Sequence, residues 1–110
     1  MLTQNQKIAF TSILIEMANA DGKVDPREFA AVKRILEGLS VDDETFMLAK
    51  HIPAEIALDV MNGASADDKV SLGVKLVEVI DADEKVDDAE IILLDHIAER
   101  LSLEAYFDKK

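Results

Sequence analysis

Six acidic side chains at matching places in two short stretches are the best candidates for chemistry in this chain. They form two groups of three: Asp21, Asp25 and Glu28, and then Asp83, Asp87 and Glu90. Hard cations such as Ca²⁺ and Mg²⁺ prefer several oxygen ligands of this kind. One group offers too few oxygens for such an ion, so a site requires both groups together. The spacing alone leaves open whether the two groups meet in space.

Both groups lie inside an internal repeat. The stretch Ile15–Val41 aligns without a gap to Val77–Leu103 at a constant offset of 62, and we place the two repeat units at residues 8–41 and 70–103. Each copy contains the end of an apolar helical run, an acidic turn and the start of another helix. We therefore interpret the chain as two helix–acidic loop–helix halves related by a pseudo-twofold axis.

The calcium loop of an EF-hand is the nearest familiar arrangement, and the residues depart from it. That loop takes ligands at positions 1, 3, 5, 7, 9 and 12, with glycine at position 6. If Gly22 is at position 6, position 1 is Met17, and in the second copy it is Val79, and neither side chain can bind calcium. The second copy also has Glu84 where the glycine belongs. We therefore expect no tight, independent EF-hand site, although Gly22 should still take a positive φ.

Helix capping is the alternative explanation for four of the six carboxylates. Asp25 with Glu28, and Asp87 with Glu90, have the spacing of a capping box, in which two side chains satisfy free backbone N–H groups. Carboxylates at a helix N-terminus also gain from the helix dipole, and the same dipole repels a cation. Capping does not explain the first aspartate of each group. For that aspartate, loop hydrogen bonding and cation ligation both stay open.

The apolar periodicity and the capping signals predict an all-α fold of six to seven helices. The expected spans are residues 3–19, 25–38, 42–50, 53–61, 65–80 and 87–101, with a last short turn at 103–107. Gly38 is expected to end the second helix, and Pro53 fits the first position of the fourth. The run Val70–Ile80 is apolar nearly all round, which favours the most buried helix, with a strand as the alternative.

Composition limits the fold and the partners. The 110 residues are enough for one domain, residues 1–110, and with 49% hydrophobic but only 5% aromatic residues its core must be mainly aliphatic. Met17, Met47 and Met61 are expected to fill that core, and His51 and His96 to lie on the surface. The net charge of −11 makes nucleic acid and membranes poor partners and leaves cations and basic protein surfaces.

Several function classes lack their sequence signals. The chain has no cysteine, which excludes disulfides, thiolate nucleophiles and Cys-based metal centres and fits a reducing compartment. No nucleophile elbow, Gly-rich phosphate loop or Ser–His–Asp order occurs, so we expect no enzyme. The start of the chain lacks a signal-peptide pattern and no apolar run is long enough to span a membrane, which predicts a soluble, cytoplasmic protein.

The acidic stretches ADGKVDPRE and DADEKVDDAE resemble the duplicated acidic motifs of the tellurite-resistance TerB-like family, and the resemblance extends over about Ile8 to Leu103. It implies an all-helical fold with two related halves and a role in metal-ion or stress response. By position it implies that the six carboxylates named above form the acidic cluster. Glu84 in place of a second glycine is a departure from the pattern.

Two functions follow from these observations. The first is a non-enzymatic module that binds or senses a divalent cation, Ca²⁺ or Mg²⁺, through both acidic loops. The alternative is an acidic protein-interaction domain that binds a basic partner without metal. The sequence does not specify an oligomeric state, a pathway or a partner.

Overall fold

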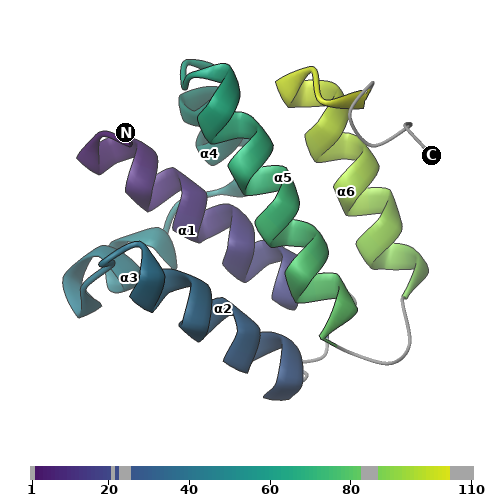
Figure 1. Ribbon diagram of the computed structural model, residues 1–110, viewed down its shortest axis with the longest axis horizontal. Helices are drawn as coiled ribbons and strands as arrows, with labels where there is room; N and C mark the ends of the chain where they lie inside the picture. The colour runs from purple at the N-terminus through teal and green to yellow at the C-terminus, as the bar shows by residue number, and fades with distance from the viewer. Residues whose placement is uncertain (1, 21, 23–25, 83–86, 105–110) are drawn as a thin grey trace.

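The computed structural model describes residues 2–20, 22, 26–82 and 87–104, and these form six helices without a strand (Figure 1). The helices are α1 (Gln4–Ala18), α2 (Pro26–Gly38), α3 (Asp43–Ala49), α4 (Ala54–Asn62), α5 (Ala66–Asp81) and α6 (Asp88–Leu101). The all-α prediction is therefore confirmed, and the Val-rich run is helix rather than strand. The expected turn at 103–107 extends beyond the described residues. Superposition of the two halves stays a prediction.

Short polar side chains begin four of the helices. Thr3, Asp42, Ser65 and Asp87 are the N-cap residues of α1, α3, α5 and α6, and each accepts a hydrogen bond from a backbone N–H in the first turn. These bonds satisfy donors that the helix itself cannot pair. Pro53 stands at the N-cap of α4 rather than at its first helical position, so α4 begins one residue later than expected.

The helices α2 and α6 end alike, at matching positions of the repeat. Ser40 and Ser102 both take left-handed backbone conformations, with φ of 58° and 59°. The next backbone N–H reaches back to a helical carbonyl in both cases, at 3.0 Å from Val41 and 2.7 Å from Leu103. This is the Schellman pattern, in which an apolar residue follows the left-handed cap. Helix α2 ends at Gly38, as expected, and the left-handed position follows two residues later, on Ser40.

Helix α1 is the centre of the core. It packs against α2, α3, α4 and α5, and its eight buried residues are Ala9, Phe10, Thr11, Ser12, Ile13, Leu14, Met17 and Ala18. Helix α5 packs against α1, α2 and α6 but leaves one side open, where Val74 is 37% exposed. The prediction that α5 is the most buried helix is wrong, because neighbours surround α1 more completely.

Other burial predictions have mixed outcomes. Met17 and Met61 are fully buried, as expected, whereas Met47 is 51% exposed because α3 buries only Thr45 and Ala49. His51 and His96 are exposed, as predicted. Within the described residues, no helix combines the length and the apolar character needed to cross a membrane.

The arrangement of α1 and α5 decides where the acidic loops attach. The two helices pack against each other and run in the same general direction, so their C-terminal ends lie on the same side, at the lower right of Figure 1. Helix α6 also begins on this side and runs back across the molecule. The helix ends from which the two acidic segments continue are therefore on one side, as a shared site requires.

Candidate functional site

The predicted acidic site is only partly described by the structure. Asp21, Asp25 and Asp83 lie outside the described residues, so their predicted roles stay predictions. The other three carboxylates are described, and each belongs to the start of a helix that follows an acidic loop: Glu28 of α2, and Asp87 and Glu90 of α6.

The two glutamates share an unusual environment. Glu28 and Glu90 occupy equivalent positions of the repeat, in the first turns of α2 and α6, and each is only 2% exposed. Glutamate is among the residues that are almost never fully buried without a partner, because desolvation of the carboxylate is costly. Burial at both equivalent positions indicates that the repeat preserves this environment.

At α6 the capping box is present. The Asp87 carboxylate accepts a hydrogen bond from the backbone N–H of Ala89 at 2.8 Å, and Oε1 of Glu90 accepts one from the backbone N–H of Asp87 at 3.1 Å. These two bonds hold both side chains at the helix start. Capping therefore accounts for Asp87 and for one oxygen of Glu90.

The second oxygen of Glu90 is not explained by capping. Oε2 is buried, and no described group donates a hydrogen bond to it. A buried acceptor without a donor loses its hydration and gains nothing in return, at a typical cost of about 1–3 kcal/mol and more for a charged group. Such an oxygen is suited to bind a cation, because a carboxylate can cap a helix through one oxygen and ligate an ion through the other.

The local geometry also excludes the EF-hand arrangement in its usual form. Met17 and Val79, which stand where the first ligand would be, are fully buried in the core. Gly22 has the expected positive φ of 77°, so the turn prediction is confirmed. The amide of Asn19, at the third position, donates to the carbonyl of Ile15 at 3.0 Å and so closes the end of α1.

On this side of the molecule, some helix dipoles disfavour a bound cation and others favour it. The N-terminus of α6 carries partial positive charge, which disfavours a cation nearby. The C-terminal ends of α1 and α5 carry partial negative charge of about half a unit each, and they lie on the same side. The dipole argument against a cation is therefore weaker in the folded molecule than the sequence suggested.

A second polar cluster joins α4 to α6, and the sequence analysis did not identify it. Arg100 of α6 pairs with both Glu55 and Asp59 of α4, and Nε2 of His96 lies 2.9 Å from Oε2 of Glu55. Each helix contributes residues four positions apart, which places them on one face. That spacing was visible in the sequence, but nothing in the sequence paired α4 with α6.

This cluster should make stability depend on pH. The hydrogen bond with His96, and then the charge of Arg100, hold the pKa of Glu55 below its ordinary value of 4.5. A carboxylate with a lowered folded-state pKa stabilises the fold above its ordinary pKa and loses that contribution as the pH falls through the lowered value. We expect the denaturation midpoint of the wild type to exceed that of Glu55→Gln at about pH 5.5, with the difference shrinking towards about pH 3.

Glu16→Gln is the matched control for this measurement, because Glu16 is exposed and makes no ion pair with any described residue. Its difference from the wild type should stay small over the same pH range. If the difference in denaturation midpoint between the wild type and Glu55→Gln does not change with pH, the charge of Glu55 does not contribute to stability.

Within the described residues, no three His, Asp or Glu side chains gather closely enough to hold a metal ion. The α4–α6 cluster is an ion-pair network. A cation site at the acidic loops requires residues outside the described part of the chain, together with Glu28, Asp87 and Glu90.

The first part of the chain matches the model of a known protein family. Residues 1–51 match the family model of Tellurite resistance protein TerB. This first part of the chain is similar to the TerB family. The matched region contains α1, the first acidic group, α2 and α3, so it includes the first copy of the repeat and not the second. The expected extent of the resemblance, about Ile8 to Leu103, is therefore matched over its first part.

The fold of the chain also occurs in a solved structure. The crystal structure of a protein of unknown function from Porphyromonas gingivalis W83 matches with a TM-score of 0.78 and 21% sequence identity, over 93% of this chain and 86% of that one. At this identity the likeness establishes a common fold. No curated protein matches the chain.

Proposed function

We propose that this chain is a TerB-like, non-enzymatic module that binds or senses a divalent cation through its two acidic loops. The observation that carries the proposal is Oε2 of Glu90, a buried carboxylate oxygen with no described hydrogen-bond donor beside the acidic segment. A cation would supply the missing electrostatic partner.

The proposed site combines side chains from both halves. Glu90 and Glu28 would contribute from buried positions, Asp87 from its exposed N-cap, and Asp21, Asp25 and Asp83 from the loops. Six carboxylates from two separate loops suit Ca²⁺, which has a flexible shell of six to eight oxygens, better than Mg²⁺, which needs octahedral geometry. Together these carboxylates also exceed the charge of one divalent ion. Relief of repulsion among these carboxylates would add to the gain on binding.

A cytoplasmic role in metal-ion or stress response is part of this proposal. The description of the matched family model, tellurite resistance protein, supports the stress-response part. The competing proposal is an interaction domain for a basic partner, which the net charge of −11 equally favours. The buried oxygen of Glu90 favours the cation, because an exposed acidic face needs no buried carboxylate.

Cation binding should raise the thermal midpoint. A ligand that binds only the folded state stabilises it by roughly 2.7 kcal/mol at a free concentration of 100 times Kd. We expect a higher melting temperature in millimolar Ca²⁺ than in chelator, as measured by circular dichroism at 222 nm, the standard wavelength for helix content.

The control for general charge screening is a monovalent salt at equal ionic strength, because screening also stabilises so acidic a protein. Equal midpoints in Ca²⁺, Mg²⁺ and matched NaCl would contradict the proposal. The interaction-domain alternative would then be the better description.

A further inference from the structure

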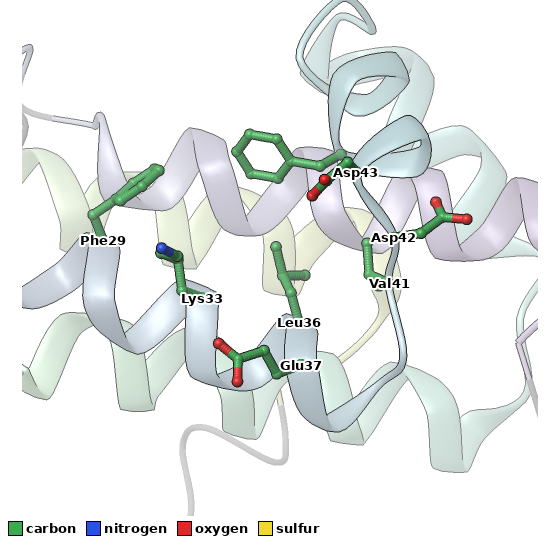
Figure 2. Close-up of a pocket in the computed structure, with 8 residues that line it drawn as sticks. Phe29, Lys33, Leu36, Glu37, Val41, Asp42 and Asp43 are labelled. Atoms are coloured by element: carbon green, nitrogen blue, oxygen red, sulfur yellow. The ribbon is translucent and has the colours of Figure 1, made fainter.

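The face formed by α2 and α3 contains a cavity of about 350 Å³ that none of the six loop carboxylates lines. Its apolar walls are Phe29 and Leu36 of α2, Val41 of the connection and Phe46 of α3 (Figure 2). At one end the rings of Phe29 and Phe46 meet edge to face, with centroids 6.4 Å apart. The volume lies at the lower end of the range for specific ligand pockets and is enough to accept a large apolar side chain.

The opening of this cavity is acidic. Glu37, Asp42 and Asp43 lie around it, against Lys33 as the one cation among the described lining residues. Hydrogen bonding to the backbone and side chain of Thr45 lowers the pKa of Asp42. The net negative rim follows the charge of the whole chain, so a basic partner would be attracted to the opening.

Two further features extend the surface beyond the rim. Met47 lies one turn after Asp43 on α3 and is 51% exposed, which adds apolar area outside the cavity. The ammonium group of Lys50 lies 5.9 Å from the centroid of the Phe46 ring. The face of this ring thus already attracts a cation of the same chain, as aromatic rings do.

We propose that this cavity, the α2–α3 groove, docks a basic amphipathic segment of a partner protein. The segment inserts one large apolar side chain between the walls and places Lys or Arg side chains over Glu37 and Asp43. An apolar anchor in a pocket with a polar rim is the usual arrangement at the centre of protein interfaces, and amphipathic helices bind grooves in this way. The groove is separate from the acidic loops, so this inference is independent of cation binding.

The test uses a short amphipathic helical peptide of Lys and Leu with a single Trp on its apolar face. The protein has no tryptophan, so Trp emission reports on the peptide alone. In buffer that contains chelator, we expect saturable binding with a blue shift of the emission, because the indole leaves water on insertion. The chelator removes any contribution from divalent ions.

Glu37→Lys should weaken peptide binding by about fivefold or more, because it replaces an attractive rim charge by a repulsive one. The matched control is Glu99→Lys, since Glu99 is exposed and is the repeat equivalent of Glu37 at the end of α6. Lys33→Glu should strengthen binding, because it removes a repulsive charge from the rim. A gain in affinity cannot result from misfolding, so this variant separates the charge effect from a loss of folded protein.

Equal weakening by Glu37→Lys and Glu99→Lys would overturn the proposal, since it would mean general attraction by net charge. Binding without a blue shift would overturn the insertion of an apolar anchor. Sedimentation of the protein without peptide tests whether a second copy of this chain occupies the groove. Self-association that Glu37→Lys abolishes would assign the groove to a second copy of this chain instead of a partner.

Discussion

Glu90→Gln is expected to weaken Ca²⁺ binding by roughly tenfold or more while leaving the metal-free protein about as stable as the wild type. The amide oxygen of glutamine can still accept the hydrogen bond from the backbone N–H of Asp87, so the cap is retained. The substitution removes one negative ligand charge, and ligand charge is a main determinant of Ca²⁺ affinity. It also removes a buried charge, which offsets any loss from the altered cap. Calorimetric titration and urea denaturation in chelator measure the two quantities separately.

Asp87 provides the comparison that separates capping from ligation. Asp87→Asn keeps an N-cap of about equal quality and should weaken cation binding, whereas Asp87→Ala should cost about 1 kcal/mol even without metal. If both Glu90→Gln and Asp87→Asn bind Ca²⁺ as the wild type does, these carboxylates only cap α6. The two-loop cation site would then be wrong.

Leu76→Ala should lower the free energy of unfolding by about 2–5 kcal/mol. Leu76 is fully buried in the core cluster to which α1 and α5 both contribute, so truncation removes apolar contacts and leaves a cavity. A loss of this size is a large share of the roughly 5–15 kcal/mol that holds a typical domain folded. The midpoint and slope of urea denaturation give the free energy of unfolding.

Leu14→Ala is the repeat-equivalent substitution, and Leu14 is also fully buried. It should cost a similar amount, because α1 is at least as enclosed as α5. Ile92→Ala is the surface control, since Ile92 is 69% exposed, and it should change stability by no more than about 0.5 kcal/mol. Equal effects of Leu76→Ala and Ile92→Ala would contradict the described core.

The sequence predicted the helices well because their signals are local. An N-cap such as Thr3 or Ser65 acts on backbone groups within three residues, and helix starts were accordingly predicted to within about one residue. The left-handed positions at Ser40 and Ser102 were missed because serine is not the residue that usually marks them. The apolar residue that follows packs against the core in both cases, with Leu103 buried and Val41 partly buried, and this packing favours the turn.

Features that depend on which helices meet were not predictable from one sequence. The exposure of Met47 and Val74 follows from the positions of α3 and α5 in the fold. The pairing of Glu55 with Arg100 requires contact between α4 and α6. For the candidate site, residue types and spacing indicated Glu90, but its burial came only from packing, because a charged residue in the first turn of a helix commonly faces water.

Both acidic segments continue from helix ends on one side of the molecule, so an ion bound there would link two distant parts of the chain. Glu28 and Glu90 are 62 positions apart, and an ion bound by both halves would act as a reversible crosslink between them. In the chain-entropy account, a permanent covalent link closing a loop of this length contributes about 4 kcal/mol by restricting the unfolded chain. This protein has no cysteine and cannot form a disulfide. If the proposed cation site exists, the two acidic turns would give the fold a crosslink that forms and breaks with the concentration of the ion.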